Sequence, residues 1–100
     1  MLRWLPLDDQ RERRARVWLA YAATAAVDPV LAAESAAMDA DLRAWFADEL
    51  TKLDAPVSAA AQLLAMIDGV TLQCLVIPMA ERPALVARTV TPFLTALTAC

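Results

Sequence analysis

Residues 58–77 read SAAAQLLAMIDGVTLQCLVI, and the spacing of their apolar side chains decides the fold. At about 100° per residue, as in an α-helix, these side chains fall on two separate faces. The two faces hold Leu63, Met66, Ile67, Val70, Cys74 and Ile77, and then Ala61, Ala65, Gly69, Leu72 and Val76. One face can serve the core of this chain, so the other needs a partner. Glycine in the middle of a helix costs about 1 kcal/mol relative to alanine. A close crossing with another helix would explain why Gly69 is tolerated despite this cost.

Upstream of this stretch, Asp28 and Pro29 mark the start of another helix. An Asp side chain can accept hydrogen bonds from the free amides of a first turn, and proline is favoured at the first helical position. The pattern predicts an amphipathic surface helix over residues 28–53. Its apolar stripe comprises Leu31, Met38, Leu42, Trp45, Phe46, Leu50 and Leu53.

Two further helices are expected over residues 8–27 and 83–98, the second kinked by Pro92, because a proline ring displaces a carbonyl and removes a donor. Residues 17–27 carry no charge on any face, so we expect the first helix to lie in the middle of the packing. No period-2 alternation is convincing. The sequence therefore predicts an all-α fold, an antiparallel bundle of about four helices.

Length and composition exclude several classes of protein. The chain has 100 residues, a formal net charge of −3, 60% apolar residues, one glycine and no histidine. It fits one small domain and is too apolar for disorder. Without histidine there is no imidazole base and no His-ligated zinc site. We therefore expect no catalytic residues, no metal and no cofactor.

Cysteine usage and the amino terminus indicate a cytoplasmic protein. Cys74 lies in an apolar run and Cys100 is the last residue, which makes neither a disulfide framework nor a metal site. Charge follows too early, at Asp8, for residues 1–6 to begin a signal peptide. The apolar stretches on either side of Asp68 are about a dozen residues long, short of a membrane span.

The apolar content exceeds what a bundle of this length can bury. A soluble monomer does not leave large apolar patches exposed. We therefore predict a symmetric homodimer in which the helices at 58–77 and 83–98 pair across a twofold axis. The alternative is a monomer with a generous core.

Charged residues offer few candidates for chemistry. Asp68 stands among apolar neighbours and can hydrogen-bond a ligand or a partner helix, or simply reach solvent or a backbone group. The first 16 residues contain five arginines, Arg3, Arg11, Arg13, Arg14 and Arg16. No aromatic interleaving accompanies them, so a solvated helix end or a seam toward a neighbour is favoured over nucleic-acid binding.

Bulky, adaptable side chains are the remaining candidates for a binding site. They are Trp4, Trp18, Tyr21, Met38, Trp45, Phe46 and Met66. Such residues can line a cavity for a small molecule. Plain core packing explains them equally well.

Three stretches in a fixed order carry a resemblance to a known family. They are residues 15–21 (ARVWLAY), Asp28-Pro29, and residues 63–73 (LLAMIDGVTLQ), followed by a last helix after Pro83. Together they resemble the C-terminal domain of TetR-family transcriptional regulators of the BetI-like subgroup. The resemblance covers about residues 4–99.

The resemblance implies a bacterial cytoplasmic repressor whose C-terminal domain dimerises and encloses a small apolar or aromatic effector. It places on the ligand side Trp18, Tyr21, Met38, Trp45 and Met66. It places in the homodimer interface Ala65, Gly69, Leu72 and Val76, with Val86, Val90, Phe93 and Leu97 from the last helix. It implies no membrane partner.

The family's helix-turn-helix domain has no counterpart here, so we expect a fragment that does not itself bind DNA. The rival hypothesis is a ligand-free helical module that dimerises with full-length relatives. An enzyme is disfavoured, because no nucleophile is placed.

Overall fold

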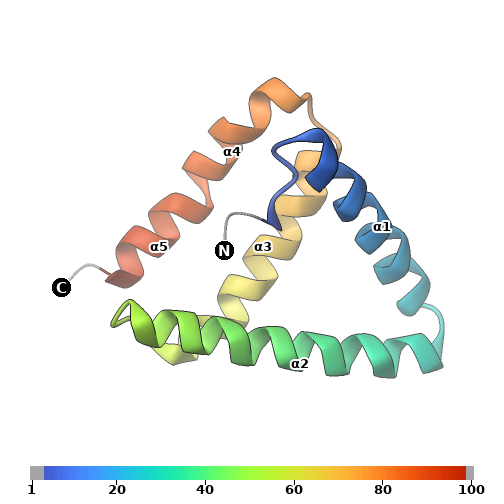
Figure 1. Ribbon diagram of the computed structural model, residues 1–100, viewed down its shortest axis with the longest axis horizontal. Coiled ribbons are helices and arrows are strands. Elements are labelled where there is room, and N and C mark those ends of the chain that lie inside the picture. Colours follow the sequence, from blue (N-terminus) through green and yellow to red (C-terminus); the bar gives the residue numbers. More distant parts are fainter. Residues whose placement is uncertain (1–3, 99–100) are drawn as a thin grey trace.

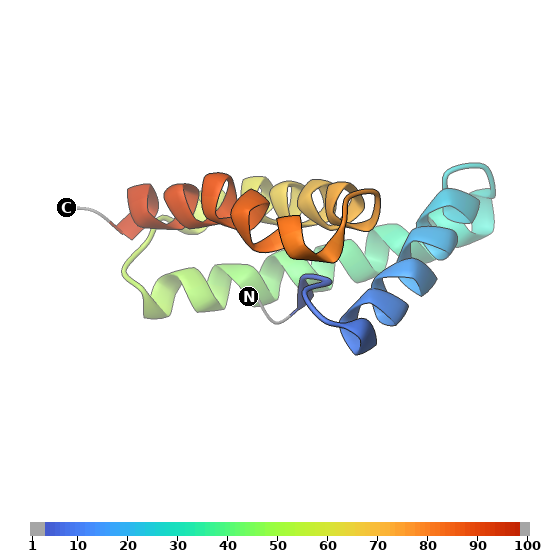
Figure 2. The same ribbon diagram turned by 90° about the horizontal axis from the view of Figure 1, so that it is seen from above.

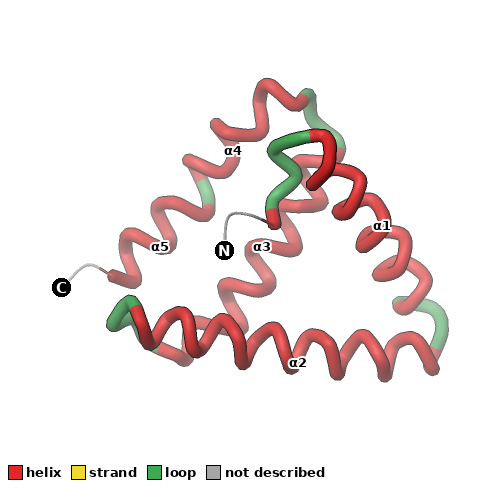
Figure 3. Tube along the Cα trace, in the orientation of Figure 1, coloured by secondary structure: helices red, strands yellow, loops and turns green. Residues whose placement is uncertain are grey.

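The computed structural model describes residues 4–98, and these residues form helices and connecting turns without a strand. The α-helices are α1 (Asp9–Ala25), α2 (Pro29–Lys52), α3 (Ala60–Leu75), α4 (Arg82–Arg88) and α5 (Val90–Thr98). Short 3-10 turns precede α3 and α4, namely η2 (Val57–Ala59) and η3 (Met79–Glu81). The predicted all-α class is confirmed (Figure 3).

Two aspartates begin the first two helices, as the sequence predicts. The Asp8 carboxylate accepts a hydrogen bond of 2.8 Å from the Arg11 amide. The Asp28 carboxylate accepts from the amides of Val30 and Leu31 at 2.9 and 3.2 Å, and Pro29 occupies the first helical position. Each cap satisfies amides that a helix leaves free at its start, which fixes where α1 and α2 begin.

The last predicted helix is divided in two at Thr89, whose backbone leaves the helical region at φ −121° and ψ −75°. Pro92 lies three residues further on, inside α5. A proline ring collides with the carbonyl four residues earlier, which belongs to Arg88, the last residue of α4. The kink expected at Pro92 is therefore a break between Arg88 and Val90.

The helices form two layers, one of α3, α4 and α5 and the other of α1 and α2 (Figure 2). Seen along its shortest axis, the molecule is triangular in outline, with α1, α2 and the α4–α5 pair along its sides and α3 crossing between them (Figure 1). The shortest dimension is 18 Å, so many side chains lie near solvent. The segment before α1 lies against this triangle and brings Leu5 fully into the core.

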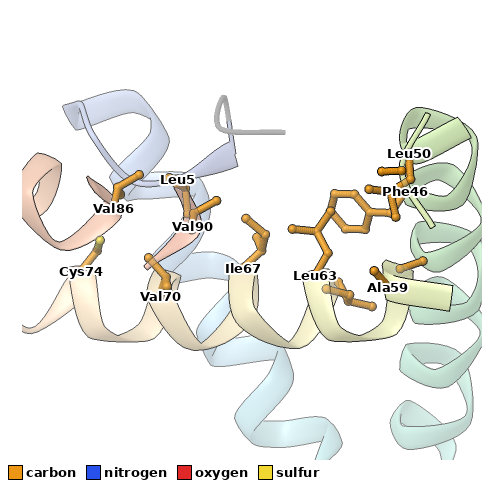
Figure 4. Packing of buried hydrophobic residues seen from close by; sticks show 13 residues of the cluster. Leu5, Phe46, Leu50, Ala59, Leu63, Ile67, Val70, Cys74, Val86 and Val90 are labelled. Atoms are coloured by element: carbon orange, nitrogen blue, oxygen red, sulfur yellow. The ribbon is translucent and has the colours of Figure 1, made fainter. Parts of the chain in front are cut away.

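One face of α3 forms the centre of the core. Leu63, Ile67, Val70 and Cys74 are buried and project from the same side of the helix (Figure 4). Phe46 and Leu50 of α2 pack at one end of this row. Side chains from the chain ends pack at the other end, namely Leu5, Val86 and Val90. Of the two apolar faces predicted for residues 58–77, the one with Leu63, Ile67, Val70 and Cys74 serves this chain's own core.

The expectation that the first helix lies in the middle of the packing is wrong. Within α1 only Ala15 and Ala25 are buried, while Val17 is 72% exposed. The helix contacts α2 and α3 along one side, and no described layer covers its other side. An uncharged stretch rich in alanine thus remains largely on the surface.

The segment Val57–Leu75 has the length and mean hydropathy of a membrane span, whereas the sequence analysis predicts no span. Core helices of soluble proteins share these properties, and 44% of this window is buried inside the fold. The segment is accordingly the central core helix.

Candidate functional site

A cavity of about 290 Å³ lies between α1, α2, α3 and the segment before α1. Its lining residues are Trp4, Arg11, Arg14, Ala15, Trp18, Leu42, Leu64, Ile67, Asp68 and Thr71. Most of this surface is apolar, which suits the body of a small organic ligand.

Two tryptophans give the cavity its aromatic wall. Trp18 comes from α1 and lies one helical turn beyond Arg14, so both side chains face the same way. Trp4 is held from behind by two rings of α2, with centroid distances of 4.9 Å to Trp45 and 5.5 Å to Phe46. The second contact is edge-to-face, a favourable arrangement that fixes the indole.

Charged groups enter the cavity from two helices. Arg11 and Arg14 come from α1, and Asp68 comes from α3. The Nε atom of Arg11 donates to the Asp8 carboxylate at 2.7 Å. Burial, with a smaller contribution from the negative charge of Asp39, raises the pKa of Asp68 from 3.8 to about 6. Asp68 forms no hydrogen bond or ion pair within residues 4–98.

We expect Asp68→Asn to stabilise the domain at about pH 7 and to leave it unchanged at about pH 4. A carboxyl group with a raised folded-state pKa contributes stability at low pH that is lost as pH rises through about 6. Solvent screening of this half-buried group limits the gain to about 1 kcal/mol. Urea unfolding at both pH values measures it, with the exposed Asp41→Asn as control. An equal effect at both pH values would contradict the shift.

A buried arginine that the sequence reading missed holds the wall of the cavity in place. The Arg82 side chain is 4% exposed. Its Nη1 atom donates to the Pro6 carbonyl at 2.8 Å, and its Nη2 atom donates to Glu12 Oε1 at 2.7 Å. It also donates to the Ile77 carbonyl at 3.3 and 3.4 Å. Arg82 thereby joins the segment before α1, α1 itself and the turn before α4.

Comparison with protein families identifies a match over almost the whole chain. The profile of the C-terminal domain of BetI-type transcriptional repressors matches residues 1–99. The chain belongs to this family. A comparison with curated proteins and with solved structures finds no significant match. The resemblance inferred from the three sequence stretches is confirmed.

Only one of the five predicted ligand residues lines the cavity of this BetI-type domain, namely Trp18. Trp45 lies behind Trp4. The Tyr21 hydroxyl donates to Glu34 at 3.0 Å. Met38 is 44% exposed on α2, and Met66 packs against the edge of the core. The sequence reading missed Leu42 and Leu64, which carry no distinguishing signal in an apolar chain.

The predicted interface residues of the BetI-type domain fall into three groups. Ala65, Leu72 and Val76 are exposed along α3, and a Cβ atom added to Gly69 meets nothing within 4 Å. Val86 and Val90 are instead buried in the core of their own chain, at 6% and 0% exposure. The other two residues of the last helix, Phe93 and Leu97, are half-buried.

Metal chemistry has no evident site in the described part of the BetI-type domain. No three His, Cys, Asp or Glu side chains among residues 4–98 are grouped to hold an ion. Cys74 is buried as a free thiol, and desolvation raises its pKa. A buried thiol of raised pKa is a poor nucleophile.

Proposed function

We propose that this repressor domain senses a small effector in the cavity between α1, α2 and α3. The observation that carries the proposal is the cavity itself, which is apolar and aromatic and is entered by a few charged groups. Ligand sites in proteins have this character. A cavity of this kind favours an effector-sensing domain over a ligand-free dimerisation module, because such a module would pair through its surface and would not need a cavity.

The second part of the proposal is homodimerisation of a cytoplasmic repressor through the exposed face of α3. Val76 is 77% exposed and Leu72 is 45% exposed on this face. Small residues at positions 65 and 69 allow a second helix to approach closely, as they would across a twofold axis. Phe93 and Leu97 of α5 can extend this surface, whereas Val86 and Val90 serve the core of their own chain.

Effector binding can act on the dimer through the contacts of Arg82. The cavity wall includes Trp4 and α1, and Arg82 joins both of these elements to the turn before α4. A ligand that favours one placement of α1 therefore favours one placement of α4 and α5. This is a shift between two shapes of one assembly.

We expect Gly69→Leu to convert the protein from a dimer into a monomer. The substitution is harmless within one chain, since an added Cβ atom has open space and leucine is a better helix former than glycine. Across a close helix crossing, the same side chain would push the partner away.

Light scattering measures the effect, with wild type at about twice the chain mass of 10.8 kDa. Ala37→Leu adds the same side chain at an exposed position of α2 and should leave the dimer intact. A dimer that survives Gly69→Leu would refute the interface. The variant should keep its helical circular dichroism and a cooperative unfolding transition, which distinguishes lost pairing from misfolding.

A further inference from the structure

The two charged walls of the cavity oppose one another. Arg11 and Arg14 stand on the α1 wall, while the only carboxylate among the lining residues, Asp68, stands on the α3 wall. No ion pair joins them among residues 4–98. The raised pKa of Asp68 traces to burial and to Asp39, with no lowering by either arginine. Asp68 and the two arginines therefore line the same cavity without forming an ion pair.

The two arginines differ in how far they are already engaged. Arg11 is bound through its Nε atom to Asp8 at 2.7 Å. Arg14 forms no hydrogen bond or ion pair within the described residues, and it is the arginine that lies one turn from Trp18. Its guanidinium is accordingly available to a carboxylate, which it can bind through two parallel hydrogen bonds.

The space between the charged groups is apolar and flat-sided. Trp4 and Trp18 supply aromatic faces, and Leu42, Leu64 and Ile67 supply aliphatic ones. A planar ring can lie against such surfaces. The volume of about 290 Å³ is at the small end for ligand sites, and it suits roughly a dozen non-hydrogen atoms.

Resting on the function proposed above, we propose that the effector is a zwitterion. Its cationic nitrogen pairs with the Asp68 carboxylate, its anionic group pairs with the Arg14 guanidinium, and a flat apolar body between them lies against Trp4 and Trp18. A ligand with one charge leaves either the half-buried Asp68 carboxylate or the exposed Arg14 guanidinium without a partner. A ligand with both charges satisfies both walls.

Four probes that share one benzene ring test this class of ligand. They are para-aminomethylbenzoic acid, benzylamine, benzoic acid and para-methylbenzyl alcohol, and calorimetry at about pH 7 measures the affinity of each. We expect the zwitterion to bind at least about tenfold more tightly than any of the others. Equal affinity for all four probes would overturn the proposal of a zwitterionic effector and would leave the cavity as a site for an apolar one. No binding by any probe would overturn the cavity as a site for ligands of this size.

Two variants assign the two ends of the ligand. Asp68→Asn should lower the affinity for the zwitterion and for benzylamine about tenfold and leave the affinity for benzoic acid unchanged. Arg14→Gln should lower the affinity for the zwitterion and for benzoic acid about tenfold and leave the affinity for benzylamine unchanged. Arg13→Gln is the matched control, because Arg13 is exposed on α1 outside the cavity, and it should change nothing.

A direct contact between Asp68 and Arg14 in the ligand-free protein is the competing arrangement. A double-mutant cycle on unfolding distinguishes it from the proposal. Additive effects of Asp68→Asn and Arg14→Gln support separated charges. A coupling between the two substitutions in the absence of ligand would overturn the proposal, as would loss of zwitterion binding in Arg13→Gln.

Discussion

Replacing Arg82 by methionine should lower the free energy of unfolding by about 3–5 kcal/mol. Methionine keeps much of the aliphatic length but removes every donor. The carbonyls of Pro6 and Ile77 then lose the guanidinium that binds them, and Glu12 loses its partner at 2.7 Å and keeps Arg16 at 3.2 Å. Each buried acceptor left without a donor costs about 1–3 kcal/mol. Urea unfolding at about pH 7 measures the loss.

Arg88→Met is the matched control, because Arg88 lies on the same helix and is exposed. It should change stability by less than about 0.5 kcal/mol. If the two variants unfolded at the same urea concentration, the Arg82 contacts would have no energetic role. The loss should also depend on pH. Arg82 lowers the pKa of Glu12 below 4.5, so this stabilisation is present above 4.5 and disappears as pH falls through the lowered pKa.

Truncating Phe46 to alanine should cost about 3–5 kcal/mol as well. The Phe46 side chain is fully buried where α2 meets α3. Its ring also makes edge-to-face contacts with Trp4 and Trp45, at 5.5 and 5.4 Å. Alanine leaves a void there and removes the support of Trp4, so a ligand in the cavity should bind more weakly too.

Phe93→Ala removes the same atoms from a half-buried position of α5. It should cost about half as much, because part of that ring is already in water. Thermal or urea unfolding of the two variants compares them directly. If Phe93→Ala proved the more damaging, the core would be centred on α5 and not on α3.

Signals that act within a few residues could be predicted from the sequence. The cap at Asp28 and the proline after it set the start of α2, and both operate within one turn. The two faces of residues 58–77 were predictable for the same reason, since helical spacing alone separates them. The break at Thr89 follows from Pro92, but its position three residues earlier needs the geometry of the i−4 carbonyl.

Features that depend on distant partners could not be predicted. Arg82 binds Glu12 and Pro6, which lie 70 and 76 residues away in the sequence, and nothing near Arg82 marks it as buried. The surface position of α1 likewise depends on which helices cover it. Composition suggested an aromatic cavity, yet only packing decides that Trp18 lines it while Trp45 supports Trp4 from behind. Asp68 stood out because it is a single charge in an apolar run.

The short segment before α1 is held firmly against the rest of the domain. Trp4 forms part of the cavity wall, Leu5 and Pro6 are fully buried, and the Pro6 carbonyl is bound to Arg82. A displacement of Trp4 is therefore passed through Pro6 to the buried Arg82 side chain. Conversely, a change in the volume of the cavity moves the segment before α1. If the cavity holds an effector as proposed, its occupancy therefore sets the position of the segment before α1.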